Sequence, residues 1–223
     1  AASDVYKRQT KEFDNRDWRL SQTVHGPGHT YQNSAGTTML KNIDFSTTKT
    51  GYAFIKWSVE IQENYSKGKA DNSLPILRLG EVLLNYAEAK AELGEMDKSI
   101  WNETVGALRE RAGVTNIYPE DANYVEDEWL KDYYADSPIK LSNTLLEIRR
   151  ERVTELIMEN GLRVSDLYRW KLGNLIRDRS TGNQGWKGIY LSTDEYNNGF
   201  EFNGYKYLFK DQAQGTYSVS YTH

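Results

Sequence analysis

Hydrophobic residues recur with the period of an α-helix in three stretches of the chain. In the first stretch, 76–93, the polar side chains fall on one narrow stripe when residues are spaced about 100° apart. Nearly all the other positions are apolar or small, so we expect a helix that packs on most of its sides and lies centrally among other helices. Gly94 can adopt the left-handed conformation that ends such a helix.

The polar stripe of this first helix has two readings. It either lines a binding groove or forms a solvated or interdomain face. We favour the second reading, because the polar side of an amphipathic helix usually faces water. The stripe consists of Arg78, Glu81, Asn85, Glu88 and Glu92.

A second helix is predicted after a short turn. Asp97 is a suitable N-cap, and Gly113 is expected to stop the helix. The two helices would form one antiparallel, tetratricopeptide-like hairpin, whose remaining faces must be buried by helices from elsewhere. The apolar face of the second helix contains Ile100, Trp101, Val105, Leu108 and Ala112.

A third helix is predicted over 141–160, and Arg149, Arg152 and Glu159 project into its apolar face. Charged groups are costly there unless they are paired. We therefore predict a structural network in which arginines lower the pKa values of the acids. The alternative is a carboxylate pair for glycoside hydrolysis, which needs a general acid with a raised pKa. The predicted partners are Arg152, Arg163 or Arg169 with Glu155, Glu159 or Asp166.

The remaining segments predict loops, a short helix and little β-structure. Residues 10–73 read as loops, with the best strand candidates at 38–43 and 52–61. A short helix is expected around 125–134. Aromatic residues alternate on both sides of Asn203-Gly204, which is typical of a two-residue β-hairpin. The predicted fold class is mainly α, a tetratricopeptide-like helical scaffold with long irregular loops and a small β-hairpin near the C-terminus.

Composition narrows the possible functions. The chain has 223 residues, of which 38% are hydrophobic and 27% charged, and this is typical of an ordered globular protein. Its formal net charge of −4 disfavours a nucleic-acid partner. It has no cysteine, which excludes disulfides, thiol catalysis and thiolate metal sites. No apolar run approaches the roughly 20 residues of a membrane helix.

Cofactor and metal sites are not expected. No glycine-rich phosphate-binding motif is present. His25 and His29 have the spacing of two helical metal ligands, but Gly26, Pro27 and Gly28 lie between them and break a helix. We therefore predict neither a bound metal nor a cofactor.

Several motifs occur in order along these segments. The helical residues that form them are Arg78, Glu81, Asn85, Tyr86, Ala87, Glu88, Ala89, Arg109, Arg111, Ala112, Gly113, Glu151, Arg152, Glu155, Leu156, Glu159, Gly161, Arg163, Asp166, Leu167, Arg169 and Trp170. Together with Arg16-Asp17-Trp18-Arg19-Leu20, they resemble the SusD/RagB family of nutrient-binding outer-membrane lipoproteins over about 15–173. The first motif is similar to the family's Arg-Asp-Pro-Arg-Leu, with tryptophan in the proline position.

This resemblance implies noncovalent capture of an oligosaccharide, or of a peptide in some branches, without chemistry on it. Members lie on the outer face of the outer membrane, anchored by a lipid, and pass ligand to a SusC-like TonB-dependent transporter. The lipid anchor and the N-terminal half of such a protein are expected to lie outside this sequence. The alternatives are a helical-repeat adaptor that binds only proteins and, less favoured, a glycoside hydrolase.

Aromatic loop residues are the candidate ligand contacts, because the flat C–H faces of sugars stack on such rings and nearby polar groups bond the hydroxyls. For any single ring, packing inside the protein is the ordinary alternative. If the family assignment holds, we expect at least two loop rings to contact ligand. The predicted binding residues are His29, Tyr31, Trp57, Tyr65 and Trp186.

The chain is expected to divide into segments of different roles. Residues 1–9 and 219–223 resemble translated adaptor sequence and are expected to be non-native. Because the first helix is apolar on so many sides, the isolated chain is expected to be marginally stable. The other segments are a loop-rich ligand-site region at 10–73, the helical core at 74–173 and an aromatic loop and hairpin tail at 174–218.

Overall fold

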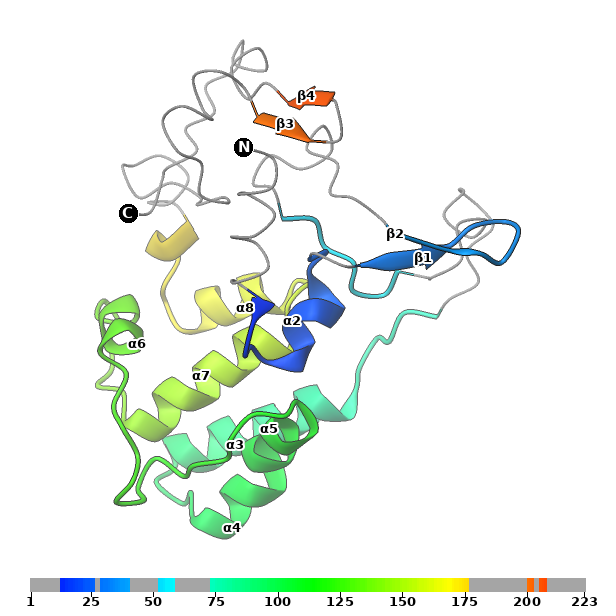
Figure 1. The fold of residues 1–223 in the computed structure, drawn as a ribbon. Helices are drawn as coiled ribbons and strands as arrows, with labels where there is room; N and C mark the ends of the chain where they lie inside the picture. The colour runs from blue at the N-terminus through cyan, green and yellow to red at the C-terminus, as the bar shows by residue number, and fades with distance from the viewer. Residues whose placement is uncertain are drawn as a thin grey trace. The chain divides into compact units, whose positions relative to one another are not determined.

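The protein folds into two compact units, one of helices and one that carries the strands (Figure 1). The helical unit comprises residues 17–19 and 74–175, and the strand-bearing unit comprises residues 1–16, 20–73 and 176–223. The predicted mainly α fold is confirmed. The computed structural model describes residues 13–26, 29–40, 52–58, 73–176, 200–202 and 205–207.

The predicted helices are present, with shifted ends. The first predicted helix is α3, the second is built from α4, η2 and α5, and the third is α7, with α6 and α8 on either side of α7 in sequence. Their bounds are α2 Trp18–Thr23, α3 Leu79–Glu92, α4 Lys98–Trp101, η2 Asn102–Gly106, α5 Ala107–Arg111, α6 Glu128–Tyr133, α7 Asn143–Glu155 and α8 Leu162–Arg169.

The helical hairpin of α3 and α4–η2–α5 is confirmed. Gly94 ends α3 with a φ of 70°, and Gly113 follows the second helix with a φ of 69°. Asp97 caps α4, because its carboxylate accepts a 2.8 Å hydrogen bond from the backbone N–H of Ile100. Local turn chemistry therefore places both ends of the hairpin.

The second helix contains a π-helical turn, η2, which the sequence pattern did not predict. This wider turn directs three consecutive residues, Thr104, Val105 and Gly106, into the interior. Gly106 leaves room for Asn116, since an added Cβ would lie 2.7 Å from Asn116 Nδ2. Asn116 Oδ1 in turn accepts a 2.8 Å hydrogen bond from the indole of Trp101.

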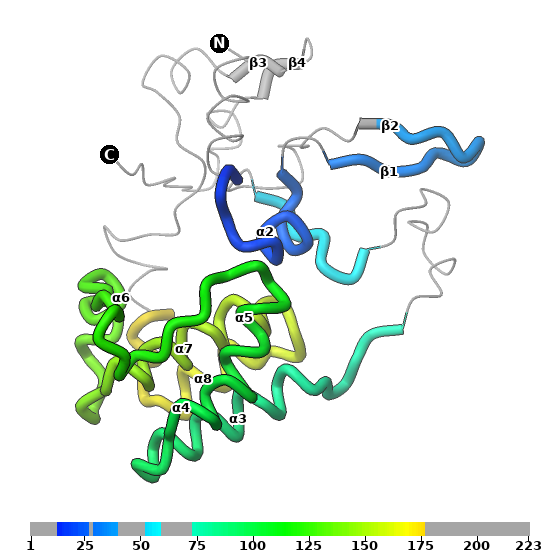
Figure 2. The backbone as a smooth tube through the Cα atoms, turned by 60° about the horizontal axis from the view of Figure 1, so that its bottom comes forward, coloured from blue at the N-terminus to red at the C-terminus, as the bar shows by residue number. Residues whose placement is uncertain are grey.

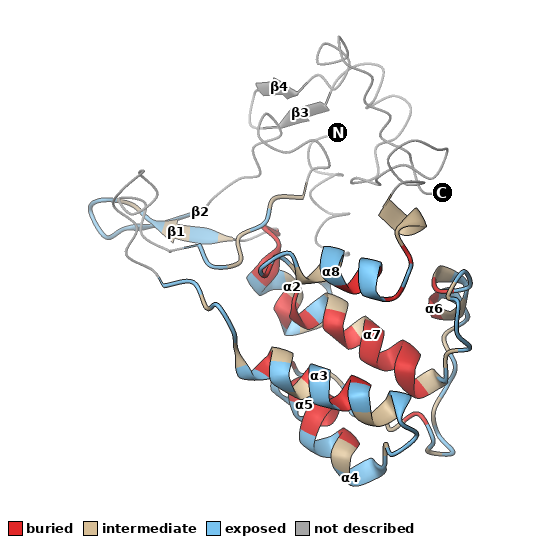
Figure 3. Cartoon of the chain, turned by 180° about the vertical axis from the view of Figure 1, so that it is seen from behind, coloured by how far each residue is buried: buried red, intermediate tan, exposed pale blue. Residues whose placement is uncertain are grey.

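The core of the helical unit lies where α3 meets α7 and the second helix (Figure 2). Helix α7 is buried along most of its length (Figure 3). Its N-terminus is capped by Ser142, as is usual for a helix start, but α7 ends at Glu155 rather than at Asn160. The core residues are Leu84, Ala87, Trp101, Val105, Leu108, Ile148 and Leu156.

The expectation that α3 packs on most of its sides is wrong for the described residues. Helix α3 contacts α7 and η2, and its third side is exposed (Figure 3). The most exposed positions include Leu79 at 70% and Leu93 at 69%. The exposed side carries Leu79, Val82, Tyr86, Ala89 and Leu93, a set that we call the α3 apolar face.

In the described residues of the strand-bearing unit, the strands form two short antiparallel hairpins. Strands β1 (Thr30–Gln32) and β2 (Thr38–Leu40) pair with Tyr31 opposite Met39. The strand predicted at 38–43 is thus confirmed over 38–40, and its last residues lie outside the described part. Strands β3 (Phe200–Phe202) and β4 (Tyr205–Tyr207) pair with Phe202 opposite Tyr205, which confirms the predicted C-terminal hairpin.

The strand predicted at 52–61 is wrong over the described residues 52–58. Phe54 forms only an isolated antiparallel bridge with Val24, and the chain then turns. Trp57 has a φ of 68°, which no β-strand allows, and the N–H of Ser58 closes the turn onto the carbonyl of Ile55 at 2.8 Å.

Candidate functional site

Two segments of the strand-bearing unit that carry predicted binding residues are joined by backbone hydrogen bonds. The N–H of His25 donates to the carbonyl of Ala53 at 2.8 Å, and the N–H of Ile55 donates to the carbonyl of Thr23 at 2.9 Å. This short ladder joins the segment that leads to His29 with the segment that leads to Trp57. The two residues, His29 and Trp57, therefore belong to one local framework, although they lie 28 positions apart in the sequence.

His29 is positioned by a second histidine. Its ring lies 4.8 Å from the ring of His25 in an edge-on arrangement, and its backbone N–H donates to the carbonyl of Gly26 at 3.3 Å. His25 is buried, whereas His29 is half-buried. Gly26 is required here, because a Cβ at this position would lie 2.5 Å from the ring of Phe13. No group of His, Asp or Glu side chains within the described residues could hold a metal ion.

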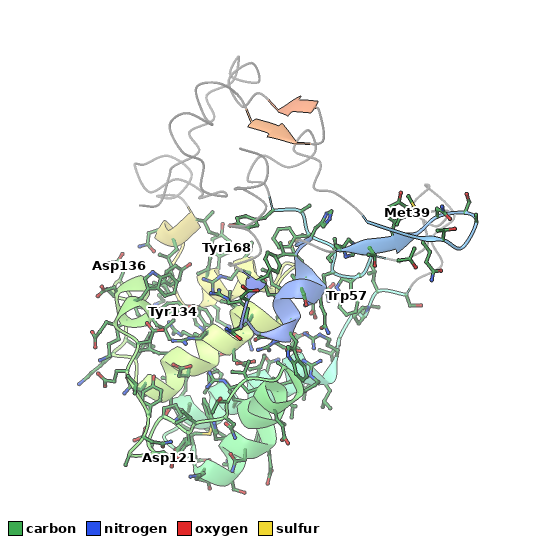
Figure 4. All side chains as sticks on the ribbon, viewed as in Figure 1. Met39, Trp57, Asp121, Tyr134, Asp136 and Tyr168 are labelled. Atoms are coloured by element: carbon green, nitrogen blue, oxygen red, sulfur yellow. The ribbon has the colours of Figure 1, made fainter. Side chains whose placement is uncertain are left out.

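Among the described residues of the predicted site, Trp57 has the most unusual backbone. Its left-handed φ of 68° is uncommon for a bulky residue, and its side chain remains 38% exposed. The Lys56 ammonium lies 5.6 Å from the centre of the indole. Strained residues of this kind cluster at ligand sites, where the surrounding structure holds them in place. Figure 4 labels Trp57 and Met39, which both belong to this unit.

Tyr31 lies on β1, half-buried, opposite the exposed Met39 of β2. The loop between the two strands is ordered by Asn33, whose side-chain oxygen accepts from the backbone N–H groups of Ala35 and Thr37 at 3.0 and 2.9 Å. Tyr65 and Trp186 lie outside the described residues. Their assignment to the site, like that of His29, Tyr31 and Trp57, stays a prediction.

The helical unit contains an extensive acid–arginine network, centred on α7. Acidic residues recur every fourth position along this helix, so three of their side chains lie in one row, and a fourth acid follows four positions later, past the end of α7. Like charges at this spacing repel, and the row is stable only because guanidinium groups from other segments lie between the carboxylates. Counted with this fourth acid, the row consists of Glu147, Glu151, Glu155 and Glu159, all buried.

Each acid of the row is bonded to at least one arginine. Arg109 donates to Glu147 at 2.6 Å and to Glu151 at 3.1 Å. Arg19 bridges Glu151 and Glu155 with one nitrogen, at 2.5 and 2.7 Å. These contacts join α2 and α5 to α7 within the helical unit.

Arg78 completes the row at its C-terminal end. It donates to Glu155 and, at 2.6 Å, to Glu159. Arg78 and Glu88 of the polar stripe thus pair with other segments of the helical unit, whereas Asn85 and Glu92 of the same stripe are exposed. The expectation of a solvated face is therefore wrong for Arg78 and Glu88 but holds for the exposed positions.

A second part of the network joins α3, α7 and α8. Arg152 forms a bidentate pair with Asp166 at 2.9 Å and donates to Asn85 at 2.7 Å. Arg169 donates to Asp166 at 2.8 Å. These pairings confirm part of the predicted network.

Among the predicted alternatives, the structure shows the pairs with Asp166. Glu155 and Glu159 also pair with arginines that were not predicted, namely Arg19, Arg78 and Arg111. Arg163 donates to tyrosine hydroxyls instead of a carboxylate. The missed partners come from distant segments, but the four-residue spacing of the acids already indicated that cations must reach them.

Glu155, the acid of the network with the most arginine partners, is not suited to act as a general acid. Burial alone would raise the pKa of Glu155, but hydrogen bonds from Arg78 and Arg19 and the charge of Arg111 outweigh it and hold this pKa below its ordinary value. Glycoside hydrolysis requires the opposite shift in one of two carboxyls. The structural interpretation of these charges is therefore supported over the catalytic one.

A row of aromatic rings in the helical unit was not singled out from the sequence. Trp129 stacks on Tyr133 with 5.2 Å between ring centres and 29° between planes. Tyr133 meets Tyr134 edge-on at 4.9 Å, and Tyr134 meets Trp170 edge-on at 6.0 Å. We call these four residues the α6 ring row. The available signal was the four-residue spacing of Trp129 and Tyr133 on a predicted helix.

Comparison with known proteins assigns the chain to a family. A family model described as the SusD family matches residues 2–221. No curated protein and no solved structure matches the chain. Along the described part of the chain, no helix has the length and apolar character needed to span a membrane.

Proposed function

Because the chain belongs to the SusD family, we propose that it captures oligosaccharides without cleaving them and delivers them to a TonB-dependent transporter. Members of this family are, in general, noncatalytic proteins that bind glycans and other nutrients at the cell surface. The family is generally one of lipoproteins associated with the outer membrane. For this protein we propose the same position, on the outer face of the outer membrane and anchored by a lipid.

The observation that carries this proposal is the placement of Trp57. An exposed indole is held in a left-handed turn, and that turn is joined by backbone hydrogen bonds to the segment of His25 and His29. A fixed and exposed indole offers one face on which a sugar ring can stack. Ligand binding then costs little ordering of the protein, because the ring is already in place.

The proposed ligand contacts are His29, Tyr31 and Trp57, together with Tyr65 and Trp186. The acid–arginine network has a different role, which is to hold the helices of the helical unit together. Its buried carboxylates are saturated by guanidinium groups, which supports binding without hydrolysis.

Calorimetric titration with a panel of soluble polysaccharides tests this proposal. We expect at least one glycan to bind and to be recovered uncleaved, and we expect Trp57→Ala and Tyr31→Ala to weaken binding by about 2- to 10-fold each. Tyr168→Ala is the matched control, because Tyr168 is an exposed ring on α8. Release of shorter sugars would support a hydrolase, and unchanged affinity in both site variants would remove these residues from the site.

The α3 apolar face favours a second candidate function, that of a helical adaptor. Its residues are spaced alternately three and four positions apart. This spacing is typical of a helix that packs along a partner helix with the same apolar spacing. In this second function, an amphipathic helix of another protein would bind to the α3 apolar face. Such an adaptor would bind no member of the glycan panel, and Leu79→Glu would abolish its complex while leaving the fold intact.

A further inference from the structure

The α6 ring row runs from solvent into the protein interior. Trp129 is 67% exposed, Tyr133 is half-buried, and Tyr134 and Trp170 are buried. A Trp side chain with most of its surface in water, stacked on a second ring, differs from an isolated exposed apolar residue. The two outer rings together form one aromatic surface.

The inner rings are held in place by cations. Arg163 donates to the hydroxyl oxygens of Tyr133 at 3.1 Å and of Tyr134 at 3.3 Å. The guanidinium of Arg149 lies 4.3 Å from the centre of the Trp170 ring and 5.5 Å from that of Tyr134. These contacts fix the orientation of Tyr133, and Tyr133 in turn supports the indole of Trp129.

Helix α6 itself is anchored to α7. Asp127 caps α6 by accepting from the backbone N–H of Leu130 at 3.0 Å, and its other oxygen accepts from Arg150 of α7 at 2.5 Å. Leu130 and Tyr134 are buried on the inner side of α6. Trp129 is therefore displayed by a fixed element rather than by a free loop, which lowers the cost of ordering it on binding.

Polar residues lie close to the two outer rings along the chain. Asp132 follows Trp129 by three positions on α6 and so is its neighbour on the helix surface, and Asp136 lies just past the end of α6 (Figure 4). Asp136 accepts a 2.7 Å hydrogen bond from the side chain of Asn174. Two adjacent rings with polar residues near them match a single sugar ring better than a protein interface, which requires about 800 Å² on each partner.

We propose that the outer surface of Trp129 and Tyr133 is a second saccharide-binding platform, distinct from the site of Trp57. Its ligand is a pyranose unit of a glycan chain, whose flat C–H face stacks on the indole while its hydroxyls bond the neighbouring carboxylate and amide groups. This inference rests on the proposed glycan-binding function, and it adds a second binding surface that lies in the helical unit.

The test is a titration of the full chain with the glycan that binds most tightly in the panel. Trp129→Ala is expected to weaken binding by roughly 2- to 10-fold, the range that aromatic contacts provide. Trp129→Phe keeps a ring and is expected to retain most of the affinity. Tyr168→Ala, an exposed ring outside the α6 ring row (Figure 4), is expected to bind like the wild type.

Indole fluorescence gives an independent readout of contact. Glycan binding is expected to shift the emission of Trp129 toward the blue, because the sugar displaces water from an exposed indole. The difference between the emission shifts of the wild type and of Trp129→Phe on glycan binding gives the contribution of Trp129. This difference would not arise if Trp129 only stabilised the fold.

The possible results distinguish a failure of the Trp129 platform from a failure of the proposed glycan-binding function. Wild-type affinity and an unchanged spectral difference in the Trp129 variants, together with weaker binding by Trp57→Ala, would overturn the platform alone. The absence of binding to every glycan in the panel would overturn both. Loss of a protein complex in Trp129→Ala, with glycan affinity intact, would identify a protein contact and also overturn the platform.

Discussion

The indole Nε1 of Trp170 donates a 2.6 Å hydrogen bond to Glu88, a residue 82 positions earlier in the chain. Arg169 donates to both oxygens of the same carboxylate at 2.8 Å. The Glu88 side chain lies on the stripe of α3 that was expected to face water, and it is buried instead. One carboxylate thus fastens α8 to α3.

Trp170→Phe is expected to lower the free energy of unfolding by about 1.5–3 kcal/mol, because it removes a donor to a buried carboxylate while keeping an aromatic ring. Urea denaturation measures this change. Trp129→Phe serves as the control, and it is expected to stay within about 0.5 kcal/mol because Trp129 is exposed. Equal midpoints for the two variants would show that Arg169 alone satisfies Glu88.

The stability of the helical unit is expected to fall in acid through Glu155. Its pKa in the folded protein lies below the ordinary value of 4.5, since arginine contacts outweigh the effect of burial. A lowered folded pKa contributes stability that is fully present above the unfolded pKa and is lost as the pH falls through the folded pKa. The difference in unfolding free energy between wild type and Glu155→Gln should therefore be largest near neutral pH and shrink in acid.

A pH series of urea midpoints measures that difference. Glu128→Gln is a suitable comparison, because the Glu128 side chain is exposed and pairs only loosely with Lys131 at 3.5 Å. A constant gap between wild type and Glu155→Gln from neutral to strongly acidic pH would contradict the assigned shift.

Arg19→Ala is expected to cost about 3–5 kcal/mol, because it leaves the buried carboxylates of Glu151 and Glu155 with fewer cations. Arg19→Lys should recover little of this, since an ammonium cannot reproduce the planar fork that spans both acids and Asp17. Lys98→Ala removes an exposed pair with Asp121 at 2.9 Å and is expected to cost less than about 1 kcal/mol.

Urea unfolding of these variants gives the comparison. Combining Arg19→Ala with Glu151→Gln should restore part of the loss, since it removes one uncompensated charge. Additive losses in the double variant would argue against direct coupling of the two side chains.

The α3 apolar face is expected to limit solubility more than folding. Leu79→Gln should reduce concentration-dependent association, measured by sedimentation velocity, with little change in unfolding free energy, because Leu79 is exposed. Leu84→Ala, in the core, is expected to cost about 2–5 kcal/mol. We also expect a low denaturation midpoint for the isolated chain, and a cooperative transition at high denaturant would contradict this.

Sequence patterns predicted the features that depend on a few neighbouring residues. Gly94 and Asp97 place the turn of the helical hairpin, and Asn203-Gly204 indicated the pairing of β3 with β4, because the required backbone conformations are encoded locally. The burial of Arg152 with Asp166 followed from charges on an apolar helix face.

Features that depend on distant segments could not be predicted in the same way. Arg19 reaches Glu151 across 132 residues, and no local spacing identifies that pairing. The burial of Glu88 and the pairing of Arg78 were missed for this reason, since these residues of the α3 polar stripe find partners on α7 and α8. The candidate site was predicted from residue type alone, so the turn that displays Trp57 and the ladder beside His25 came only from the structure.

The π-helical turn at 102–106 has a practical consequence for protein engineering. Such a turn holds one more residue than an α-helical turn, so positions after it are rotated by about 100° relative to a regular helical wheel drawn from Lys98. A designer who numbers outward-facing positions by that wheel would assign residues of α5 to the wrong side. Deleting a single residue from the widened turn would reset the phase, and Arg109 would then point away from Glu147 and Glu151.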